Sequence, residues 1–214
     1  MLSKSQIIER LKNRELIVSP VLSNAQFGNA SVDIRIGTVV SFVRARGISH
    51  VSPARHGPGS PNNVYDKEFG LRQKMERHEV PFRSPFLLHP GTLALVPTLE
   101  WFVLSNDLMG VVTARSTWAR EGLSIATANF IQPGYAGIIT LELANLGRVP
   151  IELYPGLRVA QIAFYEARPG KDEHLTERTG TFHMSFDPKH GDIAKGDEAF
   201  LPLPPSSSGD ASTK

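Results

Sequence analysis

Residues 136–166 read AGIITLELANLGRVPIELYPGLRVAQIAFYE, and this stretch carries the pattern that decides the fold. Short apolar segments rich in Ile, Leu and Val alternate with turn signals. The pattern extends back to residue 86, so residues 86–166 are strand-like almost throughout. Evenly spaced short strands predict a mainly β domain, either a barrel or a sandwich. The turn signals are Pro90-Gly91, Asn106-Asp107, Pro133-Gly134, Asn145-Leu146-Gly147 and Pro155-Gly156.

The N-terminal part adds a helix and strands to this domain. We predict a short helix over residues 3–13, because Ser3 and Gln6 have the spacing of a capping box and apolar residues follow on one face. Residues 31–43 have strand character, with a break at Gly37. Gly and Pro crowd residues 44–70, which predicts a flexible loop. We therefore expect one domain over residues 1–200 and a disordered tail rich in Pro and Ser over residues 201–214.

Composition and charge exclude several classes of protein. The chain has 214 residues and no cysteine, which excludes disulfides and every zinc site that needs cysteine, including the centre of the zinc nucleobase deaminases. Its formal net charge is only +2, without a basic stripe interleaved with aromatic residues, so we expect no nucleic-acid partner. The N-terminus lacks the apolar core of a signal peptide, and no apolar run reaches the ~20 residues of a membrane helix. We expect a cytoplasmic protein without a membrane partner.

Residues 114–123, ARSTWAREGL, hold the densest group of candidate phosphate ligands. Arg115 and Arg120 carry planar guanidinium groups that match phosphate oxygens, and the hydroxyls of Ser116 and Thr117 are short donors. If the preceding strand ends near Ala114, the following residues begin a turn or short helix whose free N–H groups favour an anion. The alternative is a capped helix with solvated arginines, and the residue types leave both open.

Glu142 is a carboxylate inside the apolar strand segment IITLEL. Strand alternation places it on one face with Thr140, while Leu141 and Leu143 lie on the other. If the leucines face the core, Glu142 faces a cleft or a subunit contact, where burial would make it a useful general base. A salt-bridged glutamate on an outer face is the alternative.

Residues 128–137, ANFIQPGYAG, form the third feature. We read Pro133-Gly134 as the turn of a rigid hairpin that could offer backbone groups and the ring of Tyr135 to a base. The alternative is an ordinary hairpin in which the tyrosine packs against its neighbours.

Five motifs together resemble the dCTP deaminase branch of the dUTPase-like superfamily. The resemblance covers about residues 5–43 and 86–166, in the family's order and spacing. It implies a distorted β-barrel of the β-clip type, assembled as a homotrimer with active sites between subunits. It also implies a deoxynucleoside triphosphate bound with Mg²⁺, and deamination without a catalytic zinc. The motifs are ASVDIRIG (30–37), HPGTLALVPTLE (89–100), RSTWAREGL (115–123), IQPGYAGIITLELANLG (131–147) and LYPGLRVAQIAFYE (153–166).

The resemblance assigns roles to individual residues. It implies that Glu142 takes a proton from water and relays protons to the ring, helped by Arg120 and Ser116. It places Arg115 and Thr117 beside the triphosphate. The backbone around Ala128 and Gln132, with Tyr135, matches the segment that reads the pyrimidine, and Arg178 or His174 is a candidate phosphate contact. The implied reaction converts dCTP to dUTP and ammonia.

Two residues depart from the family's pattern. Phe130 stands where many deaminases have arginine, and Gln132 stands where many have aspartate. In the related dUTP diphosphatases the latter position holds the carboxylate that activates water, so Gln132 argues against triphosphate cleavage. Three alternatives stay open: deamination of a modified nucleotide, a dUTP diphosphatase, and a nucleotide-binding regulator without turnover.

Overall fold

The computed structural model describes residues 1–44, 75–125, 129–167 and 184–188. The chain divides into one unit of Met1–Val43 with Arg77–Lys189 and a second of Arg44–Glu76 with His190–Lys214. Nearly all of the predicted loop at 44–70 and the whole tail at 201–214 lie outside the described residues, so the predicted single domain over residues 1–200 stays a prediction. No helix among the described residues is long and apolar enough to cross a membrane.

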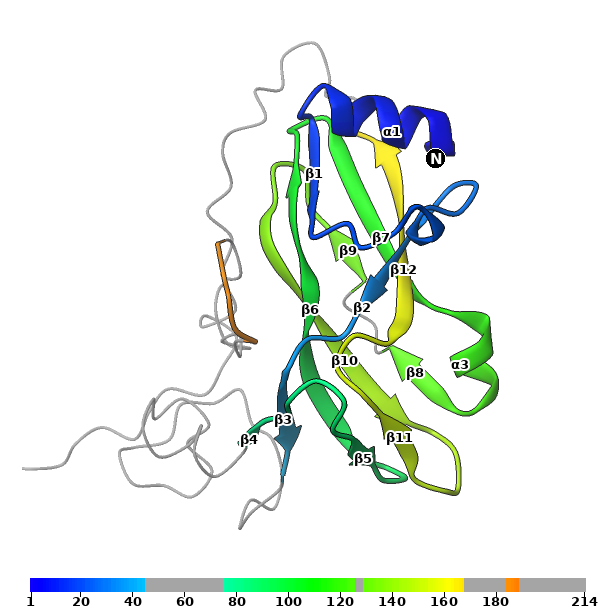
Figure 1. Cartoon of the computed structure of the whole chain (residues 1–214), viewed down its shortest axis with the longest axis vertical. Coiled ribbons are helices and arrows are strands. Elements are labelled where there is room, and N and C mark those ends of the chain that lie inside the picture. The colour runs from blue at the N-terminus through cyan, green and yellow to red at the C-terminus, as the bar shows by residue number, and fades with distance from the viewer. Residues whose placement is uncertain (45–74, 126–128, 168–183, 189–214) are drawn as a thin grey trace, which may run out of the picture. The chain divides into compact units, whose positions relative to one another are not determined.

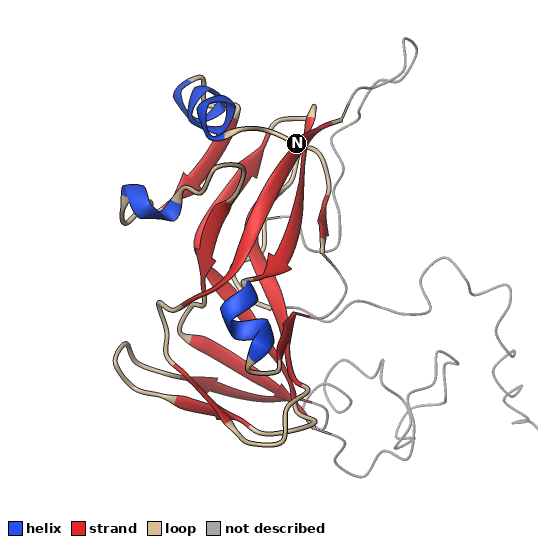
Figure 2. Ribbon diagram, turned by 90° about the vertical axis from the view of Figure 1, so that its right-hand side faces the viewer, coloured by secondary structure: helices blue, strands red, loops and turns tan. Residues whose placement is uncertain are grey.

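Strands dominate the first unit, and Figure 2 shows helices only as short segments. The mainly β class is therefore confirmed. The elements are α1 (Lys4–Lys12), β1 (Leu16–Ser19), the 3-10 helix η1 (Asn24–Gln26), β2 (Val32–Arg35), β3 (Val39–Val43), β4 (Met75–Glu79), β5 (Phe86–Leu88), β6 (Leu93–Leu104), β7 (Leu108–Ala114), α3 (Ser116–Arg120), β8 (Leu123–Ile125), β9 (Phe130–Ile131), β10 (Ala136–Asn145), β11 (Ile151–Leu153) and β12 (Arg158–Glu166).

The strands form three sheets. The largest has the order β4-β3-β6-β10-β8, with β1 also paired to β6; the second has the order β2-β12-β7-β9, and β11 pairs with β5. The long strands β6 and β10 run antiparallel at the centre of the first sheet (Figure 1). Among the described residues no ladder joins the outer strands of a sheet to each other, so the expected barrel is not closed. The outer strands are β4 and β8 in the first sheet and β2 and β9 in the second, and after each of them the chain continues into a different sheet.

Local sequence explains the helix α1. Ser3 caps it with a capping box, because the Ser3 side chain accepts from the Gln6 backbone while the Gln6 side chain accepts from the Ser3 backbone. Ile7 is fully buried in the core. The Leu2 N–H donates to the Phe164 carbonyl of β12 at 2.8 Å, which ties the start of the chain to the second sheet.

The hydrophobic core draws on residues from all three sheets. In strands such as β7, β11 and the second half of β10, alternate residues enter it, as the two-residue period predicts. The first sheet contributes Val40, Val96, Leu141 and Leu143, among others, and the second contributes Ile34 and Ile162. Where a strand alternates in this way, its other face lies outside the core, and side chains on that face are available to contact a ligand or another subunit.

Candidate active site

A cavity of about 350 Å³ lies against β2, the start of α3 and β12. Its lining includes Arg115, Ser116 and Thr117, the three residues of the arginine-rich segment that the sequence associates with a triphosphate. The remaining lining residues come from elsewhere in the chain. They are Ala25, Gly28, Ser31, Asp33, Ala114 and Gln161.

The junction between β7 and α3 delivers Arg115 to this cavity. The β7 strand ends at Ala114, and Arg115 is the extended N-cap of a helix that runs from Ser116 to Arg120. The sequence predicts a turn or short helix here if the strand ends near Ala114, and the structure has both this strand end and the helix. The Arg115 N–H donates to the Val159 carbonyl of β12 at 2.9 Å, which anchors the junction to the neighbouring strand. Ser116 and Thr117 follow in the first turn of the helix and are exposed.

A glycine ends this helix. Gly122 has φ +89°, and a Cβ at this position would lie 2.7 Å from the backbone nitrogen of Gly147. Only glycine fits both the left-handed conformation and the close approach. The glycine therefore turns the chain from α3 into β8 within two residues.

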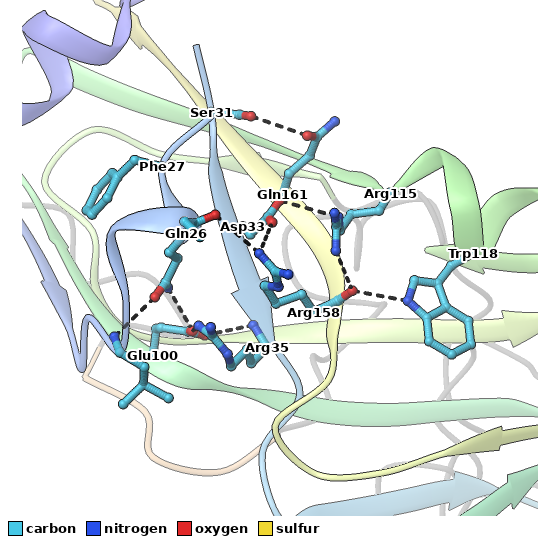
Figure 3. Close-up of polar contacts among 12 residues, drawn as sticks. Gln26, Phe27, Ser31, Asp33, Arg35, Glu100, Arg115, Trp118, Arg158 and Gln161 are labelled. Atoms are coloured by element: carbon cyan, nitrogen blue, oxygen red, sulfur yellow. Dashed lines mark hydrogen bonds and ion pairs between the residues drawn. The ribbon is translucent and has the colours of Figure 1, made fainter. Parts of the chain in front are cut away.

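Two arginines share one carboxylate at the cavity wall. Asp33 Oδ1 lies 3.4 Å from Arg115 Nε, and Asp33 Oδ2 lies 3.1 Å from Arg158 Nη1 (Figure 3). The Asp33 side chain is only 15% exposed, whereas the Arg115 side chain is 33% exposed. Two guanidinium groups against one carboxylate leave one positive charge in excess, which favours an anionic ligand.

Arg158 also fixes the surrounding backbone. Its Nη1 donates to the Ala25 carbonyl at 3.2 Å, and its own carbonyl accepts from Trp118 Nε1 at 3.1 Å and from Arg115 Nη1 at 3.4 Å. Figure 3 shows these contacts meeting at β12. One residue thus joins the η1 segment, β12 and α3 around the cavity.

Gln161 and Ser31 complete the polar wall. Ser31 Oγ donates to Gln161 Oε1 at 3.2 Å, and Gln161 Nε2 donates to Thr113 Oγ1 at 3.4 Å. Asp33, Arg158 and Gln161 were not predicted as site residues. Their signal is a polar side chain within an apolar strand, the same signal that singles out Glu142.

Glu142 lies on β10, on the face predicted for it. Leu141 and Leu143 are buried in the core at 1% and 0% exposure, and Glu142 on the opposite face is half-buried. The residue opposite Glu142 on β6 is Leu95. Within the part of the chain that the structure describes, the Glu142 side chain has no hydrogen bond or ion pair. It is not among the lining residues of the cavity.

Arg120 and Gln132 are also separate from the cavity lining. Arg120 is exposed at the end of α3, and Gln132 is exposed after β9. Ala128, Arg178 and His174 lie outside the described residues.

The predicted hairpin at Pro133-Gly134 is wrong. The strand before it, β9, pairs with β7, and the strand after it, β10, pairs with β6 and β8. The turn itself is real, because the Tyr135 N–H donates to the Gln132 carbonyl at 3.2 Å and Gly134 has φ +73°. It carries the chain from the second sheet to the first.

Tyr135 is half-buried and packs against the core, as in the alternative considered for it. Its hydroxyl donates to the Ile138 carbonyl. Burial raises the pKa of Tyr135 to about 12. The hydroxyl is therefore neutral throughout the physiological range.

Comparisons with known proteins agree on one family. A family model described as dCTP deaminase-like matches residues 1–167. A dUMP-forming dCTP deaminase of Dictyoglomus turgidum is 32% identical over 191 residues, which cover 88% of this chain and 92% of that protein. A dCTP deaminase of Halorubrum lacusprofundi is 35% identical over 202 residues, covering 92% of this chain and 93% of that protein.

One solved structure has a similar fold. It is the 2'-deoxycytidine 5'-triphosphate deaminase of Agrobacterium tumefaciens, with a TM-score of 0.56 and 25% sequence identity. The match covers 76% of this chain and 47% of that chain, so this chain spans about half the length of the solved one.

Proposed function

The chain belongs to the dCTP deaminase-like family, and from that premise we propose that it removes the amino group of dCTP by hydrolysis. The observation that carries the proposal is the cavity lined by Arg115, Ser116 and Thr117, with its excess of positive charge. A substrate with a triphosphate matches this chemistry. The proposed reaction makes the chain a hydrolase of deoxynucleotide metabolism, acting in the cytoplasm.

Arg115 is the main triphosphate ligand in this proposal. Among the described residues its guanidinium makes two contacts, both of 3.4 Å, with Asp33 Oδ1 and the Arg158 carbonyl. Contacts of this length leave its remaining N–H donors free to turn toward phosphate oxygens. The hydroxyls of Ser116 and Thr117 add short donors at the same wall.

We propose that Mg²⁺ arrives with the triphosphate and neutralises part of its charge. Mg²⁺ keeps several waters and is bound mainly through substrate phosphates, with one or two carboxylates. Asp33 is the carboxylate in the cavity lining and already faces two guanidinium groups. A carboxylate beside the three proposed phosphate ligands fits a metal that is held mainly by substrate phosphates.

Glu142 is the proposed general base. In the proposed step it takes a proton from water while the water oxygen bonds to C4 of cytosine, and it passes this proton to N3 of the ring. Glu142 then carries the proton of the new C4 hydroxyl to the amino group, the C4–N bond breaks, and ammonia leaves as the C4 carbonyl forms. Arg120 and Ser116 are proposed to hold the water and the developing charge. The half-exposed carboxylate of Glu142 supports this role, because no described side chain competes for it.

We propose that the active site forms between subunits of a homotrimer. The family resemblance is the origin of this proposal, and the separation of Glu142 from the lining of the cavity supports it. Apolar side chains outside the core offer further support. Ile17 is 39% exposed and pairs across the strands with half-buried Val103, and Phe186 is 73% exposed against the ring of Trp101.

Mixed oligomers test this arrangement. E142Q subunits are expected to be inactive alone, and R115M subunits to have little activity at dCTP concentrations well below their raised KM, where the mixture is assayed. If each site takes Glu142 from one subunit and Arg115 from another, random mixing regains about a quarter of the wild-type activity, since each site draws two subunits at random. No recovery in trimers shown to be mixed would contradict a shared site.

We propose dUTP as the product, because the amide of Gln132 cannot accept a proton from water as a carboxylate does. A second candidate is dUMP, which the name of the Dictyoglomus relative favours. Incubation with Mg²⁺ and each deoxynucleoside triphosphate, followed by chromatography and mass measurement, distinguishes the two. Conversion of dCTP supports the proposal, and recovery of every nucleotide unchanged would overturn it in favour of a regulator or a modified substrate.

A further inference from the structure

The buried carboxylate of Glu100 hydrogen-bonds two segments that form one wall of the cavity, although Glu100 itself does not line the cavity. Glu100 on β6 is 0% exposed and is not among the cavity's lining residues. Glu100 Oε1 accepts from Gln26 Nε2 at 2.9 Å and from Arg35 Nη1 at 3.2 Å, and Oε2 accepts from the Arg35 backbone N–H at 2.9 Å (Figure 3). Burial raises the pKa of Glu100, and the hydrogen bonds from Arg35 oppose this rise.

The two residues that Glu100 holds belong to the segments that form one wall of the cavity. Gln26 follows Ala25 in η1, and Arg35 lies two residues after Asp33 on the same face of β2. Ala25 and Asp33 both line the cavity. A shift of either segment therefore moves the wall directly.

The β2 strand needs this support because it is the outer strand of its sheet. It pairs with β12 on one side. At Arg35 the N–H on the other side donates to the carboxylate of Glu100 instead of to a strand. Isolated bridges join Val32 to Phe27 and Ile36 to Thr98 at the two ends of this segment. Between them, at Arg35, the carboxylate of Glu100 accepts the outward N–H, so the position of β2 at this point depends on Glu100.

On the cavity side, η1 and β2 contact two arginines from other elements, Arg158 of β12 and Arg115 before α3. Arg158 Nη1 bonds both the Ala25 carbonyl, at 3.2 Å, and Asp33 Oδ2, at 3.1 Å. Asp33 in turn faces Arg115. Glu100 is thus connected, through η1 and β2, to the guanidinium group that the proposed function assigns to the triphosphate.

We propose that Glu100 is a positioning residue for nucleotide binding: by holding Gln26 and Arg35 from the buried side, it fixes Ala25 and Asp33 and through them the orientation of Arg115. This inference rests on the proposed function. It assigns Glu100 no contact with the substrate.

Glu100→Gln is the direct test. Its side chain has the same shape, but one oxygen becomes an NH₂ group that faces donors, so at least one of the three hydrogen bonds is lost in either orientation. Gln26→Met removes one donor to Glu100, which keeps both hydrogen bonds from Arg35, and it also removes the acceptor of the Leu22 N–H. Thr98→Val is the control for general destabilisation of β6: Thr98 Oγ1 donates to the Glu100 carbonyl and accepts from the Ile139 N–H, so its loss disturbs the same strand while the three hydrogen bonds of the Glu100 carboxylate stay in place.

The readouts are KM and kcat for dCTP with Mg²⁺, and the affinity for inorganic tripolyphosphate by calorimetry. We expect Glu100→Gln and Gln26→Met each to raise KM and weaken tripolyphosphate about tenfold, the effect of losing one buried hydrogen bond, with a smaller change in kcat. The double variant should do no worse than the more affected single variant, because both act through one network. Thr98→Val should keep the wild-type KM.

The outcomes separate the two proposals. If the wild type does not convert dCTP, the proposed function fails, and tripolyphosphate binding still tests the positioning role. If the wild type converts dCTP but Glu100→Gln and Gln26→Met keep its KM, the positioning role is wrong. An equal rise of KM in Thr98→Val would likewise overturn it, because the effect would then be general destabilisation. If Glu100→Gln does not fold, Gln26→Met alone decides.

Discussion

Replacing Arg115 by methionine should weaken triphosphate binding far more than it weakens the fold. In the part of the chain that the structure describes, the Arg115 guanidinium has two long contacts, 3.4 Å to Asp33 and 3.4 Å to the Arg158 carbonyl, and its side chain is one-third exposed. Ion pairs of this kind contribute about 0–1 kcal/mol to stability. Asp33 also keeps its second partner, Arg158. The free energy of unfolding should therefore fall by less than about 1 kcal/mol.

The cost to binding is larger, because Arg115 is proposed to make charge-assisted hydrogen bonds to phosphate oxygens. Such bonds are worth about 1.5–3 kcal/mol each, and every 1.4 kcal/mol is a factor of ten in affinity. The loss of one bond raises the Kd for tripolyphosphate by about 10- to 100-fold. Arg115→Lys, which keeps the charge and loses the planar fork, should fall between the wild type and Arg115→Met.

Isothermal titration calorimetry with tripolyphosphate and urea unfolding on the same preparations measure both effects. Arg148→Met is the matched control, since Arg148 is exposed in the loop before β11 and its loss changes the net charge equally. The reasoning is refuted if Arg115→Met weakens binding no more than Arg148→Met does. It is also refuted if the loss of stability exceeds the loss of binding free energy.

Three further predictions concern the fold around the site. Gly122→Ala should lower the free energy of unfolding by about 1–3 kcal/mol, and Gly91→Ala by less in the same chemical denaturation, because Gly91 has a φ of +70° with open space for a Cβ. Tyr135→Phe should cost about 1 kcal/mol through a buried carbonyl left without its donor, and in the wild type this hydroxyl should ionise only near pH 12 in an ultraviolet titration. The hydrogen bond from Ser105 holds the pKa of Asp107 below its usual value, with a further contribution from Arg10. Stability from this carboxylate is present above its unfolded-state pKa and is lost as the pH falls through its lower folded-state pKa, so Asp107→Asn should flatten the acid limb of the stability curve; an unchanged limb would contradict this.

Local patterns in the sequence were sufficient for the individual elements. The capping box at Ser3 and Gln6 specifies the start of α1 through contacts three residues apart. Strand alternation predicts that Glu142 lies on the other face of the strand from the buried Leu141 and Leu143, because the face of a side chain depends only on its position along its own strand.

Strand pairing could not be read in the same way. The period of two residues gives the face of each strand and says nothing about its neighbour. Pro133-Gly134 was therefore read as a hairpin, although β9 and β10 belong to different sheets. For the same reason the sequence could not show whether the sheets close: a barrel was expected, and among the described residues the sheets are not joined into a closed barrel.

The cavity was recovered only in part, because half of its chemistry comes from distant segments. Arg115, Ser116 and Thr117 are consecutive and visible as one motif. Asp33 and Arg158 meet across 125 positions of sequence, through the pairing of β2 with β12. In the sequence, Asp33 and Arg158 are each a single polar residue in a strand, and nothing nearby in the sequence connects one with the other.

Ammonia release from dCTP by the wild type and by Glu142→Gln tests the central claim most directly. The account predicts release by the wild type with Mg²⁺, at least a hundredfold loss in Glu142→Gln as is typical of a removed general base, and dCTP affinity within about twofold of the wild type. Glu79→Gln, an exposed glutamate on β4, is the control and should keep full activity. Ammonia release by Glu142→Gln at the rate of the wild type would contradict the account.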